Sequence, residues 1–194
     1  MSLYEIFTFK RLLKKIYKGQ KIDILEWGSG GSTVYFTDFL RKKNIPYTWT
    51  SVEYNKGWHE KVSKEVSNDP DTKVVLFDVG NSVIRQRHTD MEDYIKYPKS
   101  TGQKFDLMFV DGRKRRRCLL ESRDIVKNEG VVLLHDACRK YYQCSFREYP
   151  NNTFIGLNLW IGRINQVSFL RKILNRCQRF ILETLFMYFI RPVR

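Results

Sequence analysis

The stretch IDILEWGSGGST, residues 22–33, places a short apolar run directly before three glycines. The apolar run, residues 22–27, predicts a buried strand, and residues 32–43 predict a helix capped by Ser32 or Thr33. A strand, a glycine turn and a helix bring backbone N–H groups against a nucleotide-like ligand, because glycine has no Cβ to hold the ligand away. The stretch therefore predicts a ligand site at the turn.

Two ligands compete for this turn. A dinucleotide fingerprint needs G-x-G-x-x-G, but Thr33 stands at the third glycine position. The pattern acid-x-G-x-G is filled by Glu26, Gly28 and Gly30. An acid just before the glycines would repel a pyrophosphate and suits a ligand that carries an ammonium group. A glycine-rich turn with a purely structural role is the remaining alternative.

Length, composition and charge limit the class of protein. With 194 residues and 42% hydrophobic content, the chain is most simply one globular domain. The net charge of +14 predicts attraction to an anionic partner, such as nucleic acid, an acidic or phosphorylated glycan, or a lipid surface. The four cysteines lack the spacing of a zinc or disulfide framework. With neither a signal peptide nor a spanning segment evident, we expect a cytoplasmic protein.

The order of predicted elements defines the fold class. Strands are expected at 22–27, 47–53, 73–77, 105–110 and 131–134, with helices at 32–43, 55–66 and 115–127 between them. The polar stretch 80–103 predicts a long loop with a helix near 90–96. A short helix is expected at 137–146, and a closing strand pair at 147–149 and 153–162 around a turn at 150–152. Alternating strands and helices predict an α/β fold with a parallel sheet and right-handed crossovers.

Polar residues fall at the ends of these strands. In a parallel sheet all carboxyl ends lie at one edge, where ligands bind. The residues concerned are Glu26, Glu53, Asp78, Asp111, His135 and Asp136. Glu53 stands where a carboxylate could accept from both hydroxyls of a ribose.

Two segments flank this core. Residues 1–19 contain an amphipathic helix, expected to pack on the sheet, with a cover over the ligand as the alternative. Residues 164–194 form a basic amphipathic helix, separate from a domain at 1–163. This helix suits packing on the domain or a homodimer, and alternatively contact with a membrane surface, which would make the protein peripheral to a membrane.

The motifs DLMFVDGR (106–113) and EGVVLLHD (129–136), with the glycine turn, resemble the small class I S-adenosylmethionine-dependent O-methyltransferases. These enzymes act on glycans, natural products and other small hydroxylated molecules. The resemblance covers about residues 20–162 and is specific for the superfamily rather than for a substrate. It implies a Rossmann-like, doubly wound, mostly parallel seven-stranded sheet with an antiparallel final strand.

The resemblance also implies a cofactor site for S-adenosylmethionine. In the family, the acid at the position of Glu26 helps to hold the methionine end, and a polar group after the third strand meets the adenine. The cofactor-binding residues that we predict are Glu26, Gly28, Ser29, Gly30, Ser32, Glu53, Tyr54, Asp78, Val79 and Asp111.

Transfer of a methyl group to a hydroxyl needs a base or a metal. His135, beside Asp111 and Asp136, is the predicted base, and His88 is a secondary candidate. Metal-dependent relatives bind a divalent cation through acids placed like Asp111 and Asp136, so Mg²⁺ is the rival, although Ala137 stands where an Asn ligand would be.

A run of cations follows the fourth strand. Arg113, Arg115 and Arg116 are predicted to hold a phosphate or carboxylate of the acceptor, because guanidinium groups bind such anions with paired donors. The leading hypothesis is therefore an enzyme that methylates a hydroxyl on a small anionic acceptor, such as a glycan or lipid-linked sugar. The alternatives are an RNA methyltransferase, with nucleic acid the less favoured partner, and a non-enzymatic membrane-associated or assembly protein. A dehydrogenase ranks last because of Glu26 and Thr33.

Overall fold

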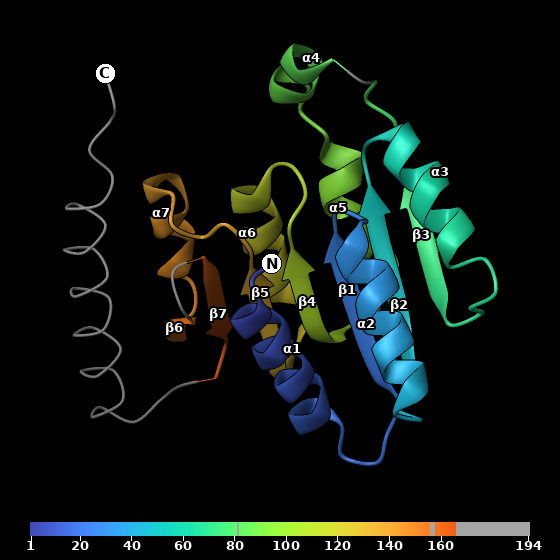
Figure 1. Cartoon of the computed structure of the whole chain (residues 1–194). Helices are drawn as coiled ribbons and strands as arrows, with labels where there is room; N and C mark the ends of the chain where they lie inside the picture. Colours follow the sequence, from blue (N-terminus) through green and yellow to red (C-terminus); the bar gives the residue numbers. More distant parts are fainter. Residues whose placement is uncertain (81, 156–157, 166–194) are drawn as a thin grey trace.

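The computed structural model describes residues 1–80, 82–155 and 158–165 (Figure 1). The strands are β1 (Ile22–Trp27), β2 (Tyr47–Glu53), β3 (Thr72–Leu76), β4 (Phe105–Val110), β5 (Val126–Leu134), β6 (Asn151–Ile155) and β7 (Leu159–Arg163). The helices are α1 (Leu3–Ile16), α2 (Gly31–Lys42), α3 (Lys56–Glu65), α4 (Val83–His88), α5 (Glu92–Ser100), α6 (Arg115–Ile125), the 3₁₀ turn η1 (Lys140–Tyr142) and α7 (Gln143–Phe146). Within the described ranges, every helix is too short or too polar to cross a bilayer.

All seven strands form one sheet in the order β3-β2-β1-β4-β5-β7-β6. The pairs from β3 to β5 are parallel, whereas β7 runs antiparallel to both β5 and β6. This topology confirms the predicted Rossmann-like sheet with an antiparallel final strand. The order reverses between β1 and β4, which is where such sheets bind ligands.

Helices cover both faces of the sheet, and each face has its own core (Figure 1). On one face, Phe9 of α1 stacks on Phe36 of α2, with ring centroids 4.0 Å apart, and meets Phe109 of β4 edge-on at 5.2 Å. On the other face, α5, α6 and α7 bury aromatic and aliphatic side chains against the same strands. The predicted packing of the N-terminal helix on the sheet is therefore what the structure shows.

Several element boundaries differ from the prediction, most of all around β5 and in the stretch 80–103. The sixth helix ends at Ile125, and β5 begins at Val126 rather than at residue 131. Residues 128–130 lie within β5 instead of between helix and strand. A register shift in the pairing with β4 accommodates them. In the stretch 80–103 the structure has two helices, α4 and α5, where we expected one within a loop.

The final hairpin also turns later than predicted. Asn152 pairs with Gly162 and Ile155 pairs with Leu159, so residues 151 and 152 lie in β6 rather than in the turn predicted at 150–152. The predicted C-terminal helix lies almost wholly in 166–194, outside the described residues, and its separation from a domain at 1–163 stays a prediction.

Candidate active site

A cavity of about 430 Å³ opens at the carboxyl ends of β1, β2 and β4. Its walls come from the glycine turn, the ends of these strands and the starts of three helices. The lining residues are Met1, Ile6, Gly28, Ser29, Gly30, Gly31, Ser32, Tyr35, Phe36, Glu53, Tyr54, Trp58, Asp111 and Gly112. Seven of the predicted cofactor residues therefore lie together in one cavity: Gly28, Ser29, Gly30, Ser32, Glu53, Tyr54 and Asp111.

The glycines of the turn have different reasons to be glycine. Gly28 has a φ of +95°, and a Cβ there would lie 2.7 Å from the backbone of Gly112, so the chain itself requires glycine. At Gly30 and Gly31 a Cβ would meet no protein atom within 4 Å. Since Gly30 also lines the cavity, the space beside it belongs to the cavity rather than to packing.

Glu26 does not line this cavity, and its predicted part in holding the methionine end of the cofactor stays a prediction. Its side chain is 0% exposed, and both oxygens accept hydrogen bonds within the protein. The donors are the hydroxyls of Ser32, Thr33 (2.5 Å) and Ser51 (2.7 Å) and the indole N–H of Trp49 (3.0 Å). Burial raises the pKa of Glu26 to about 7, against the opposing effect of these donors. The carboxyl group thus stabilises the start of α2 through buried hydrogen bonds outside the cavity lining.

The same contacts change the predicted helix cap. The hydroxyls of Ser32 and Thr33 turn toward Glu26, and α2 begins one residue earlier, with Gly30 as its N-cap. The amide of Gly30 donates to Thr33 Oγ1 at 3.1 Å. A buried carboxyl group needs partners more than an exposed helix end does, and this need decides the cap.

Glu53, at the end of β2, lies on the cavity wall and is 2% exposed. Its Oε2 accepts from the amide (2.6 Å) and hydroxyl (2.9 Å) of Ser29. Its Oε1 accepts from the amides of Tyr54 (2.9 Å) and Asn55 (2.8 Å). This carboxylate therefore joins the glycine turn to the start of α3.

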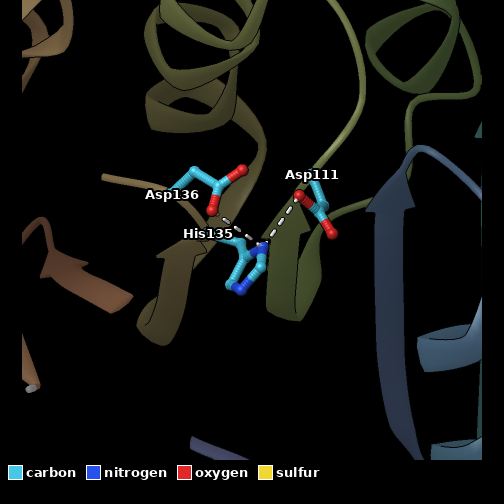
Figure 2. A group of neighbouring side chains, drawn as sticks. All are labelled: Asp111, His135 and Asp136. Atoms are coloured by element: carbon cyan, nitrogen blue, oxygen red, sulfur yellow. Dashed lines mark hydrogen bonds and ion pairs between the residues drawn. The ribbon is translucent and has the colours of Figure 1, made fainter. Parts of the chain in front are cut away.

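Three polar side chains meet at the ends of β4 and β5, beside the cavity (Figure 2). His135 Nδ1 lies 3.1 Å from Asp111 Oδ1 and 3.8 Å from Asp136 Oδ1. The hydrogen bond to Asp111 is the main cause that raises the pKa of His135, against partial burial. Because an ionised carboxylate only accepts, we assign the Nδ1 proton to this bond and leave Nε2 as the basic nitrogen of neutral His135.

Arg115 holds these two strand ends together. Its side chain is only 15% exposed, and all three guanidinium nitrogens contact protein oxygens. The backbone acceptors are the carbonyls of Asp111 (2.8 Å), Gly112 (2.9 Å) and His135 (2.6 Å). The ionic partners are Asp111 Oδ1 at 3.0 Å and Asp136 Oδ2 at 3.5 Å. With its donors so engaged, Arg115 would have to break these contacts to hold an anion, and its predicted part in binding the acceptor stays a prediction.

Asp111, His135 and Asp136 form a candidate ligand set for a metal ion. Asp111, His135 and Asp136 each offer one ligand atom, and these atoms lie within 4.8 Å of one another. However, the guanidinium of Arg115 contacts both carboxylates and already supplies the positive charge that a cation would bring. The same Asp111 oxygen also meets His135. As arranged, these residues do not fit Mg²⁺.

The remaining predicted residues are absent from the cavity lining. Arg113 donates to Gln86 Oε1 (3.3 Å) and lies 5.6 Å from the centre of the Tyr54 ring. Arg116 is exposed, 5.7 Å from the Tyr141 ring. Outside the cavity lining are Asp78, whose Oδ1 accepts from the amide of Gly80 (2.7 Å), Val79, which packs on the core, and His88, which is exposed.

Sequence reasoning gave a cover over the ligand as one alternative for the N-terminal helix, but it named none of the residues that the starts of α1 and α3 bring to the site. Met1 just before α1, Ile6 of α1 and Trp58 of α3 line the cavity, while Glu5 is buried near His135. The signals were present, since Ser2 and Glu5 have capping-box spacing and Asn55 caps α3 just after Glu53. Their position over the cavity depends on packing between distant segments, which the spacing does not reveal.

Residues 25–137 match the family described as "Methyltransferase domain", which is more than half of the chain. The chain belongs to this family, and it is an enzyme of the class I S-adenosylmethionine-dependent methyltransferase superfamily. No curated protein matches the sequence.

Solved structures share the fold over most of the chain. A methyltransferase-like protein from Silicibacter pomeroyi is 22% identical, covers 92% of this chain and 94% of its own, and has a TM-score of 0.61. Human methyltransferase-like protein 13, in complex with S-adenosylhomocysteine, is 14% identical. The match covers 93% of this chain and 90% of the human chain, with a TM-score of 0.58. Spermidine synthase from Thermotoga maritima is 12% identical. The match covers 87% of this chain and 60% of the synthase chain, with a TM-score of 0.52. At these identities the likeness shows the fold alone, which serves more than one reaction.

Proposed function

We propose that the protein transfers a methyl group from S-adenosylmethionine, bound in the cavity beside Gly30, to a hydroxyl group of a small anionic acceptor. One observation carries this proposal: the cavity has open space at the glycine turn and reaches, through Asp111, the histidine at the end of β5. An ordered glycine turn, a carboxylate at the end of the second strand and a nearby base are the parts that this reaction needs.

The cavity residues suit the cofactor. Bound S-adenosylmethionine would supply a methyl group carried on a positively charged sulfur. Gly31 and Ser32 at the start of α2 line the cavity, where a helix start offers amide donors, and Glu53 offers acceptors for ribose hydroxyls. Three of the four donors to Glu53 are backbone amides, so the hydroxyl of Ser29 is the one that can turn away to admit a ribose hydroxyl.

The residues at β4 and β5 suit removal of the acceptor proton. His135 Nε2 receives the proton, and Asp111 holds the ring through Nδ1 and stabilises the positive charge that forms. Arg115 keeps the ends of both strands in place. The contact between Arg115 and the two carboxylates supports proton transfer without a resident metal ion.

The preference for an anionic acceptor rests on two cations that follow β4, one of which contacts a residue of the cavity wall. Arg113 lies beside Tyr54 on the cavity wall, and Arg116 is exposed on the first turn of α6. Both can face a carboxylate or phosphate, whereas Arg115 cannot without breaking its present contacts. An acidic sugar, free or linked to a lipid, is the acceptor class that these groups favour.

Calorimetric titration with S-adenosylhomocysteine tests the cofactor site. We expect a dissociation constant in about the micromolar range for the wild type, and no binding of NAD. Gly30→Ala should weaken binding at least about tenfold, because its methyl group would enter the cavity. Gly57→Ala in α3 is the matched control, since Gly57 lies outside the cavity lining and a Cβ there meets only Asn55 Oδ1, at 3.4 Å.

A second experiment tests the acceptor class. S-adenosylhomocysteine release from S-adenosylmethionine is measured with glucuronate, with uncharged glucose and with a structured RNA. Faster release with glucuronate, reduced by Arg113→Ala or Arg116→Ala, would support an anionic hydroxyl acceptor. Release with RNA alone would replace this proposal by the RNA hypothesis.

A further inference from the structure

Glu5, in the first turn of α1, is a buried acid with an unusual neighbour. Its side chain is 5% exposed, and its Oε2 lies 3.8 Å from His135 Nε2. Within the described residues, His135 is the only basic group that forms an ion pair with Glu5. A buried carboxylate without a compensating positive group is costly, so this pairing requires an explanation.

Helix capping explains why the acid is at this position but not why it faces His135. Ser2 and Glu5 form a capping box, in which the amide of Ser2 donates to Glu5 Oε2 (2.6 Å) and the amide of Glu5 donates to Ser2 Oγ (3.3 Å). Most capping boxes lie at the surface, where neither group needs a third partner. Here Phe9 packs on Phe36 and Phe109, and the start of α1 lies at the end of β5, where Glu5 contacts His135.

The two nitrogens of His135 therefore face two acids from distant parts of the chain. Asp111 meets Nδ1 from the end of β4, and Glu5 faces Nε2 from α1. Met1 and Ile6, on either side of Glu5 in the sequence, line the cavity. The same helix turn thus forms a wall of the cavity and contacts the nitrogen that, in the proposed function, receives the proton.

We infer that Glu5 is a positioning residue of the methyl-transfer site: its carboxylate faces Nε2 of His135 and stabilises the imidazolium once that nitrogen has taken a proton, so that α1 is a working part of the site. This inference rests on the proposed function. In the neutral ring Asp111 holds the Nδ1 proton, and Nε2 has no proton to donate to Glu5; a proton that arrives at Nε2 meets the negative charge of Glu5 at once.

Two variants separate this role from helix capping. Glu5→Gln keeps the shape and an oxygen that can accept from the amide of Ser2, but it removes the charge that faces His135. Ser2→Ala removes the other half of the capping box and leaves the carboxylate in place. Both are made in the full chain, and circular dichroism checks that each variant is folded.

The readout is the imidazole N–H resonance of His135 in ¹⁵N-labelled protein at pH 7, identified by its loss in His135→Asn. We expect a sharp Nδ1–H signal in the wild type and in Ser2→Ala, because the proton is held by Asp111 and shielded from water. In Glu5→Gln we expect protonation of Nε2, followed by the ring ¹⁵N resonances between pH 5 and pH 9, to move to lower pH, because the carboxylate that stabilises the imidazolium is gone. An unchanged titration in Glu5→Gln, or an equal shift in Ser2→Ala, would overturn the inference.

Titration with S-adenosylhomocysteine on the same samples tests the proposed function separately from the role of Glu5. We expect less than about a threefold change in affinity in Glu5→Gln, since Glu5 does not line the cavity. Failure of the wild type to bind would refute the proposed function, and with it the role of Glu5 in methyl transfer, whatever the resonance shows. Binding by the wild type with a resonance indifferent to Glu5 would refute the inference alone.

Discussion

The two halves of the site are ordered by different forces. At the ends of β1 and β2, the turn is held by glycine geometry and by neutral donors to two buried acids, Glu26 and Glu53. At the ends of β4 and β5, a cation, a histidine and two carboxylates hold one another. The first half depends on shape and hydrogen bonds, and the second depends on charge.

This difference suits the two tasks. A cofactor site must present fixed hydrogen-bonding groups and empty space, which a turn held by shape and by buried hydrogen bonds supplies. Proton transfer needs groups whose charge changes during the reaction, and fixed neighbours of opposite charge stabilise such a change. The comparison predicts that steric changes disturb the first half most, and charge changes the second.

The largest effect is expected for Gly28→Ala. The positive φ and the 2.7 Å approach to the backbone of Gly112 should together cost about 3 kcal/mol of unfolding free energy. Gly30→Ala, where φ is extended and the neighbouring space is open, should cost less than about 1 kcal/mol. Urea denaturation of both variants measures the difference, and similar losses would show that the turn is not held by shape.

The next effect is a pH dependence carried by Glu26. Its pKa rises from 4.5 to about 7 on folding, because burial disfavours the anion. The native state therefore holds the proton more tightly, and stability from this group is full below about pH 4.5 and lost as the pH rises to about 7. The loss should be roughly 3 kcal/mol.

Urea denaturation between pH 4 and pH 8 tests this, with Glu26→Gln as the control that cannot titrate. Every other titrating group is shared by the two proteins, so the difference between their pH profiles isolates Glu26. Parallel profiles would mean that Ser32, Thr33, Ser51 and Trp49 stabilise the anion well enough to cancel the effect of burial.

The same contrast explains which features could be predicted from the sequence. The strand ends, the glycine turn and the position of Glu53 follow from local patterns, since hydrophobic runs and glycines act over a few residues. The inward direction of Glu26 and the engagement of Arg115 could not be predicted, because both depend on which donors and acceptors the fold brings together. The placement of Glu5 depends in turn on how α1 packs across the sheet.

A smaller effect is expected where charge orders the site. Arg115→Ala leaves Asp111 and Asp136 without their shared cation and frees the strand-end carbonyls that it binds. We expect a loss of about 2 kcal/mol in unfolding free energy, partly screened because the group is not fully buried. Arg116→Ala, the exposed neighbour, should change stability by less than about 0.5 kcal/mol. Equal losses of unfolding free energy in the two variants would show that Arg115 does not stabilise the ends of β4 and β5.

The smallest effect concerns magnesium, and it tests the charge balance of the second half directly. In the wild type, the guanidinium of Arg115 already lies against both carboxylates, so 10 mM Mg²⁺ should leave the melting temperature unchanged relative to a control of equal ionic strength. In Arg115→Ala the two acids are free to accept a cation, and Mg²⁺ should then stabilise the variant by about 1 kcal/mol or less. Differential scanning calorimetry of both proteins decides the point. Stabilisation of the wild type by Mg²⁺, but not by matched Na⁺, would mean that Arg115 yields to the ion and that the acids of β4 and β5 form a metal site after all.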